Sequence, residues 1–158
     1  IWITLRRFSY IDVVMQKTDF HDAVEQVLAN DSRYSGDSYY FLQEVLLKAV
    51  EMQRKETGGE NKHVTGGDLL EVFRDRILDQ FGPMTMTVLQ EWGLSKSEDV
   101  GDMVFNLIES GAFGKSEHDK REDFMDGYKF YDVFVVPFLP ESKKIIDGNS
   151  DCRDLNIV

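Results

Sequence analysis

The stretch from Phe81 to Phe113 constrains the fold of this chain most strongly, because it holds two helix patterns and the residues that end them. The predicted stops are glycines, which adopt left-handed backbone conformations without steric cost. A proline suits the first turn of a helix, where its missing N–H would have no partner, and a serine supplies an N-cap. The pattern predicts two helices joined by a tight connector. The residues that begin or end the helices are Gly82, Pro83, Gly93, Ser97 and Gly111.

Three further helical patterns precede this stretch. Apolar residues recur at helical spacing over residues 19–28, and a wider stripe over 35–56 is typical of a central helix with neighbours on more than one side. The third pattern opens with Thr65 and Asp68, which have the spacing of a capping box, and continues to the stop at Gly82. Together the patterns predict a mainly α fold, a compact single domain of about five helices.

The C-terminal third has the weakest pattern. Its aromatic-rich segment 124–138 fits either strand or helix, and we favour a helix before Pro137, with a small β-hairpin around 112–130 as a further possibility. The chain becomes polar after Pro140. We therefore expect a single helical domain over 15–140, followed by a polar, mobile tail over 141–158.

The first residues, 1–14, need a separate interpretation. They start with Ile1 and place the basic pair Arg6–Arg7 after apolar residues, which is the reverse of the order in a secretory signal. We interpret Met15 as the start of the protein and 1–14 as a non-native or upstream-translated extension. A short strand that pairs with the domain is the alternative.

Composition limits the partners. The net charge of −11 would repel polyanions unless a local basic patch overcame the average field, which argues against nucleic acid and anionic membranes. No apolar run approaches the roughly 20 residues that a membrane helix requires. The single cysteine, Cys152, excludes an intrachain disulfide and cannot build a thiolate metal site alone. These features favour a cytoplasmic protein.

The sequence contains no recognisable catalytic, cofactor-binding or metal motif, and we expect no cofactor. His63 and His118 lack the partner four residues away that a helical metal site requires. The segment 118–126 adds four acidic residues to His118, but it lacks the spacing and glycine of a calcium loop, so a solvated, salt-bridged turn is favoured. Asn106 interrupts an apolar run, and we expect a solvent or helix–helix hydrogen-bonding position, with a ligand contact as the alternative.

Four aromatic residues are candidates for an exposed apolar patch, which would mark an interaction surface. Burial in the core is the alternative that their residue types favour. The candidates are Trp92, Phe113, Phe134 and Phe138.

The order of elements from Trp92 onward has an analogy in DNA-binding proteins. A helix ending at Trp92, a short connector, a helix ending at Gly111 and a possible hairpin follow the order of a winged-helix DNA reader. The second of these helices should then present basic or amide side chains to DNA. Its charged residues are instead Glu98, Asp99, Asp102 and Glu109, so a shape of this kind would serve protein contact better.

Four segments, taken in order, resemble a family of small uncharacterised bacterial proteins of planctomycete and verrucomicrobia type. The resemblance spans about residues 18–140 and leaves 1–14 and the tail outside. It implies a single cytoplasmic domain, and it implies no activity, cofactor or catalytic residue. The segments are DSRYSGDSYYFLQEVL, HVTGGDLLEVFRDRILDQFGPMTMTVLQEWGL, VFNLIESGAFGKSEHDKREDF and FVVPFLP.

Three functional hypotheses follow from these features. The first is a non-enzymatic interaction or regulatory module that binds another protein or associates with itself. The second is a winged-helix-like nucleic-acid binder, which the net charge disfavours. The third is a small enzyme or metal binder that uses His63 or the acidic cluster from His118 to Asp126.

Overall fold

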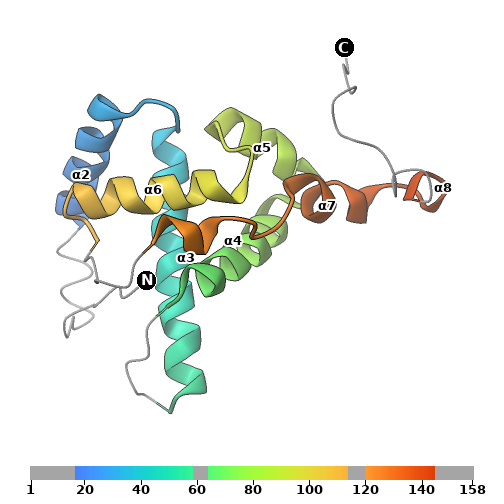
Figure 1. The fold of residues 1–158 in the computed structure, drawn as a ribbon, viewed down its shortest axis with the longest axis horizontal. Coiled ribbons are helices and arrows are strands. Elements are labelled where there is room, and N and C mark those ends of the chain that lie inside the picture. The colour runs from blue at the N-terminus through green and yellow to red at the C-terminus, as the bar shows by residue number, and fades with distance from the viewer. Residues whose placement is uncertain (1–16, 59–63, 114–119, 145–158) are drawn as a thin grey trace.

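The chain folds into a bundle of helices (Figure 1), and the computed structural model describes residues 17–58, 64–113 and 120–144. Five helices of eight or more residues follow one another in the described part, which confirms the predicted mainly α class. They are α2 (Lys17–Asn30), α3 (Gly36–Glu56), α4 (Gly66–Phe81), α5 (Thr85–Trp92) and α6 (Ser97–Glu109). The 3₁₀ turn η1 (Gly82–Met84) joins α4 to α5.

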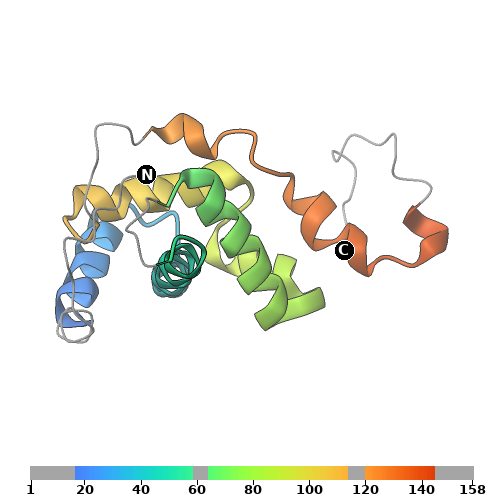
Figure 2. The same cartoon turned by 90° about the horizontal axis from the view of Figure 1, so that it is seen from below.

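Helix α3 runs through the middle of the bundle, as its wide apolar stripe predicts. Helices α2, α4 and α5 all contact it, and α6 crosses it in Figure 1. Figure 2 shows the same bundle from below, with α3 seen nearly end-on and α6 and α4 beside it. The fully buried side chains come mainly from α3, α4 and α6 and include Tyr39, Leu42, Leu69, Phe73, Met103 and Leu107.

Local capping explains two helix boundaries. Thr65 Oγ1 accepts a hydrogen bond from the Asp68 backbone N–H at 3.1 Å, and Asp68 Oδ2 accepts one from the Thr65 N–H at 3.0 Å. The predicted capping box is therefore confirmed at the start of α4. Gly93 ends α5 in the left-handed conformation, at φ 82°, as predicted.

Two predicted end residues differ in detail. Ser97 is the first residue of α6 instead of its N-cap, because its hydroxyl donates to the Phe124 carbonyl oxygen at 3.0 Å. Asp99, in the first turn of α6, reaches back to the residues before the helix, and its carboxylate accepts from the backbone N–H groups of Ser95 at 2.8 Å and Lys96 at 3.1 Å. Gly82 has a positive φ of 49°, but its ψ of −125° lies outside the left-handed helical region.

The C-terminal third is built of short helical turns. They are η2 (Arg121–Phe124), α7 (Phe130–Phe134), η3 (Val136–Phe138) and α8 (Glu141–Lys144). The helix favoured before Pro137 is confirmed by α7. The possible hairpin falls partly on residues 114–119, which lie outside the described ones, and its described parts contain no strand. The expectations for 1–14 and for 145–158 also lie outside the described residues.

Candidate functional site

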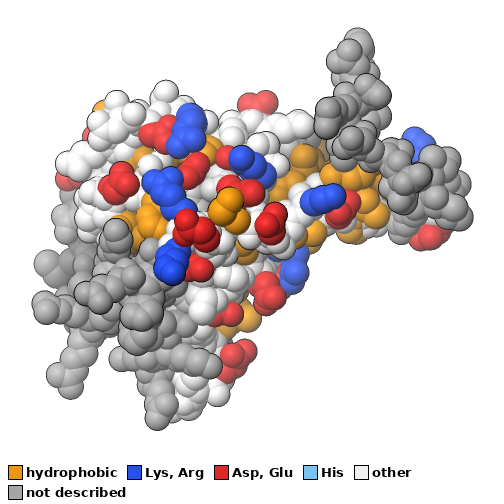
Figure 3. All heavy atoms as spheres, viewed as in Figure 1, with side chains coloured by type: hydrophobic (Ala, Val, Ile, Leu, Met, Phe, Trp, Pro, Cys, Tyr) orange, Lys and Arg blue, Asp and Glu red, His pale blue; other side chains and the backbone are white. Residues whose placement is uncertain are grey.

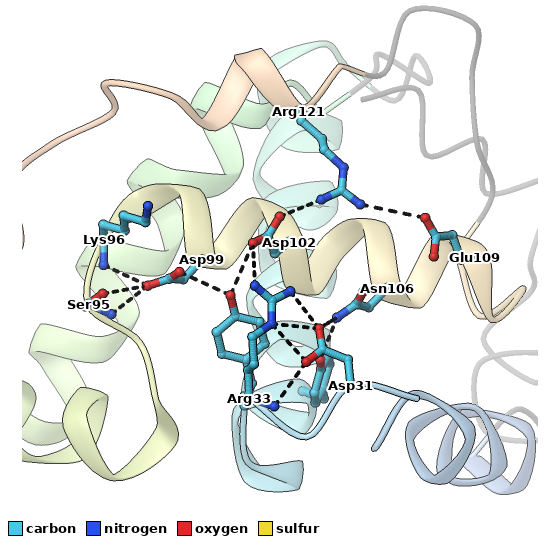
Figure 4. A network of polar contacts seen from close by, with 11 residues as sticks. Asp31, Arg33, Ser95, Lys96, Asp99, Asp102, Asn106, Glu109 and Arg121 are labelled. Atoms are coloured by element: carbon cyan, nitrogen blue, oxygen red, sulfur yellow. Dashed lines mark hydrogen bonds and ion pairs between the residues drawn. The ribbon is translucent and has the colours of Figure 1, made fainter. Parts of the chain in front are cut away.

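A network of polar side chains joins the connection between α2 and α3 to helix α6 and to η2 (Figure 4). Arg33 donates from Nε to Asp31 Oδ1 at 2.9 Å and from Nη2 to Asp31 Oδ2 at 2.7 Å. Its Nη1 lies 3.4 Å from Asp102 Oδ2. Arg121 donates to the other oxygen of Asp102 at 2.6 Å. Asp102 therefore lies between two guanidinium groups that come from different parts of the chain.

Asn106 enters this network from α6. Its Nδ2 donates to Asp31 Oδ2 and to the Tyr39 hydroxyl, both at 3.1 Å. The predicted helix–helix hydrogen-bonding position is therefore confirmed for Asn106. Because both contacts are with side chains of the bundle, the amide nitrogen positions helices and is not aimed at a ligand.

The network shifts the pKa values of Asp31 and Tyr34 in opposite directions. Hydrogen bonds from Arg33 hold the pKa of Asp31 well below its usual range, although burial acts in the opposite direction. The Tyr34 hydroxyl donates to Asp99 at 3.1 Å and to Asp102 at 3.3 Å. Burial and then the charges of these two carboxylates raise the pKa of Tyr34. A general acid or base works best with a pKa near neutrality, so Asp31 and Tyr34 are unsuited to that role.

His63 and His118 lie outside the described residues. Arg121, which belongs to the acidic segment 118–126, pairs with Asp102 and lies 3.7 Å from Glu109, and both of these acids belong to α6. Within 17–58, 64–113 and 120–144, no group of three or more metal-ligating side chains is placed to hold an ion.

The four candidate aromatic residues have different environments. Phe113 is 8% exposed and stacks on Phe20, and Phe134 is 1% exposed. These two are therefore buried in the core, which is the alternative that their residue types favour, and they contribute nothing to an exposed patch. Trp92 is partly buried and lies in an aromatic group with Phe41 and Phe81, with ring centroids 5.2 and 5.7 Å away. Only Phe138, at 45% exposed, presents much of its side chain to solvent.

Helix α6 has the position of a DNA-reading helix in the chain order but not its exposure. Nine of its residues are buried, among them Val100, Val104 and Leu107. It contains no Lys or Arg, and its Asp102 is engaged by two arginines. A recognition helix presents its side chains to the major groove, whereas α6 is held inside the bundle.

A second apolar feature lies in the C-terminal third and is larger than the single residue Phe138. Residues 133–140 are eight consecutive apolar residues, and we call this segment the apolar arm. Phe134 is its only buried member; Pro137, Phe138 and Pro140 are exposed, and the others are partly exposed. Figure 3 shows apolar side chains gathered in this region, and Figures 1 and 2 show α8 extending away from the bundle beyond α7.

Sequence reasoning identified only two residues of the apolar arm. The signal that it missed was the unbroken run itself, because eight consecutive apolar residues, two of them prolines, have no polar positions to face the solvent. The rings that anchor the arm are Tyr128, Phe130 and Phe134, whose centroids lie 5.2 to 6.0 Å apart.

None of the helices in the described part is both long and apolar enough to cross a membrane. Comparisons of the chain with protein-family models, with curated proteins and with solved structures gave no match.

Proposed function

We propose that this chain is a non-enzymatic interaction module that presents the apolar arm, residues 133–140, to another protein. The main observation in its support is the exposed ring of Phe138 within an uninterrupted apolar segment that extends from the bundle. Exposed apolar patches on a soluble domain mark contact sites, because their burial on binding is favourable. A cytoplasmic location belongs to the same proposal and rests on the single cysteine of the chain.

The base of the arm supports this proposal because it is anchored in the bundle. Phe130 and Phe134 are buried, and the Tyr128 hydroxyl donates to the Leu70 carbonyl oxygen of α4 at 3.0 Å. Pro137 and Pro140 restrict the backbone beyond that base. A segment that is already ordered loses less conformational entropy on binding, so more of the contact energy remains as affinity.

The arm also differs from the rest of the surface in charge. Residues 133–140 carry no charged side chain, in a chain whose net charge is −11. A partner that binds the arm does not have to neutralise charge, so an apolar groove on a folded protein is the complementary surface. Recognition of an exposed aromatic anchor by such a groove is a common basis of binding energy at protein interfaces.

The test compares capture by three forms of the tagged full-length chain from native lysate. Phe138→Ser removes the exposed ring, and Met84→Ser removes a similarly exposed apolar side chain from η1, where Met84 is 58% exposed. We expect proteins recovered with the wild type and with Met84→Ser to fall about tenfold with Phe138→Ser, which corresponds to a loss of ~1.4 kcal/mol. Circular dichroism confirms that all three forms are folded. Equal recovery by both variants contradicts the proposal.

A further inference from the structure

The turn between η2 and α7 contains the dipeptide Asp126–Gly127, and both of its residues are exposed. Among the described residues, Asp126 is the only one other than glycine that has a positive φ, at 56°. Aspartate and asparagine adopt this left-handed backbone conformation more readily than most other residues do. The backbone of the turn therefore favours an aspartate at position 126.

Position 127 requires a glycine because the chain passes close to two helices. A Cβ on Gly127 would lie 2.7 Å from Leu70 Cδ1 of α4 and 3.2 Å from Ser97 Cβ of α6. Leu70 is 2% exposed, so its methyl group is packed on all sides and does not move aside freely. The fold thus places a residue without a side chain directly after Asp126.

The peptide unit between these two residues is not held by the backbone. Within 17–58, 64–113 and 120–144, neither the Gly127 N–H nor the Asp126 carbonyl oxygen takes part in a backbone–backbone hydrogen bond. The anchors lie on either side of the pair: Phe124 is fully buried, and the Tyr128 hydroxyl donates to the Leu70 carbonyl oxygen at 3.0 Å. Rotation of the peptide unit between the anchors therefore breaks no backbone hydrogen bond of the described part.

An aspartate followed by a glycine holds an electrophile and a nucleophile that can close a five-membered ring. The electrophile is the side-chain carboxyl carbon of Asp126, and the nucleophile is the backbone nitrogen of Gly127. Glycine favours the attack because it has no Cβ to hinder the approach to its nitrogen. Because both groups belong to one chain, they react at a high effective concentration.

We propose that Asp126 isomerises spontaneously to isoaspartate in the folded protein. The Gly127 nitrogen forms a bond to Asp126 Cγ, the nitrogen loses its proton and the carboxyl group loses its hydroxyl, which releases one water and leaves a succinimide. Water then adds to the backbone carbonyl carbon of Asp126, and the bond from that carbon to nitrogen breaks as nitrogen regains a proton. One water leaves and one enters, and nothing is oxidised or reduced.

The product has a main chain that runs through the side-chain carbons of residue 126 and is one carbon longer. The added carbon lies between the anchors Phe124 and Tyr128, so it alters the contact that Gly127 makes with Leu70. The same segment leads from α6 to the apolar arm in the chain. The reaction itself does not depend on whether the arm binds a partner.

The test follows the tryptic peptide 122–129, in which Asp126 is the only aspartate followed by glycine. The full-length chain is kept at physiological pH and temperature for several weeks in water labelled with the heavy oxygen isotope, and it is digested in ordinary water. We expect a second chromatographic form of the peptide that carries one heavy oxygen. Fragmentation by electron transfer should place isoaspartate at residue 126.

Asp123 is an internal control within the same peptide, because the side chain of Phe124 hinders attack by the nitrogen that follows Asp123. We expect isomerisation at Asp126 to exceed that at Asp123 by at least about tenfold. Equal conversion at the two residues, or none at Asp126, overturns the proposal. Asp126→Glu keeps the charge but requires a larger ring, so the second form should disappear; its persistence would place the reaction elsewhere.

A synthetic peptide of residues 120–129 gives the rate of the same reaction without the fold. A site that reacts only after global unfolding is slowed by about a thousandfold or more, because the unfolded fraction is that small. We expect the folded chain to react less than about a hundredfold more slowly than the peptide, since the turn is exposed and its peptide unit is free to rotate. Any greater slowing means that the fold protects Asp126 and overturns the proposal.

Discussion

Gly101 of α6 faces Phe124 so closely that a Cβ on Gly101 would lie 2.7 Å from the Cβ of Phe124 and 2.8 Å from its ring. This pair joins the segment 120–128 to α6. It explains why a glycine stands within a helix whose neighbouring residues, Val100 and Met103, are fully buried. The contact between Phe124 and Gly101 can therefore be tested directly.

Gly101→Ala should lower the free energy of unfolding by about 1–3 kcal/mol, because the added methyl group forces Phe124 out of its seat. Urea denaturation followed by circular dichroism measures the change. Gly67→Ala is the control: its nearest neighbour would be 3.8 Å away, so the helix propensity of alanine should leave stability unchanged or higher. An equal loss of stability in the two variants would show that Phe124 does not pack against Gly101.

Gly93→Ala should destabilise the fold more than Gly58→Ala. Both glycines have a positive φ, 82° for Gly93 and 66° for Gly58, so both substitutions carry the left-handed penalty of roughly 1–2 kcal/mol. At Gly93 the new Cβ would also overlap the Arg33 carbonyl oxygen, whereas at Gly58 it meets nothing. The difference between the two losses measures this second effect, and thermal unfolding of both variants determines it. A difference of zero would contradict the close approach of Gly93 to the chain before α3.

Arg33→Gln should raise the pKa of Asp31 toward the ordinary value of 3.8, because the hydrogen bonds from Arg33 are the main cause of its depression. A depressed pKa in the folded state means that the stabilisation is complete above pH of about 3.8 and is lost as pH falls through the folded value. An NMR titration of the Asp31 carboxyl carbon in both proteins tests this. Arg74→Gln, whose partner is Asp75, is the control and should leave the Asp31 pKa unchanged. An unshifted pKa in Arg33→Gln rules out this pairing.

Phe134→Ala and Phe138→Ala should separate the base of the apolar arm from its exposed part. Phe134 is 1% exposed, so its truncation should cost about 3–5 kcal/mol of stability, while Phe138 at 45% exposed should cost less than about 1 kcal/mol. Chemical denaturation of both variants gives the comparison. A large loss for Phe138→Ala would mean that its ring packs on the domain and is not available to a partner.

The helices were predictable because their signals are local. Thr65 and Asp68 cap α4 within one turn, and Gly93 ends α5 through its own backbone conformation. Such signals need no knowledge of the rest of the fold. The boundary at Ser97 was the exception, since its hydroxyl donates to the distant Phe124 carbonyl oxygen and the N-cap position is held by Lys96.

The packing of Phe124 on Gly101 and the exposure of the apolar arm were not predictable, because both depend on contacts between residues that are remote in sequence. From the sequence alone, Gly101 is a residue of low helix propensity within a helix. Only the position of Phe124 explains why a glycine is needed there. Residue type likewise gives the same expectation for Phe113, Phe134 and Phe138, although two are buried and one is exposed. Exposure is a property of the assembled fold. The sequence could therefore supply candidate residues for an apolar surface, but it could not show which of them are exposed.

The most direct test of the interaction proposal places a photo-crosslinking amino acid at position 138 of the full-length chain. Irradiation in the cell should then yield covalent adducts with another polypeptide, while the same amino acid at Met84, which is also exposed, should yield few. Mass spectrometry of the adducts identifies the protein that contacts the arm. Position 138 giving no adduct above the Met84 level would contradict the claim that the apolar arm binds a partner.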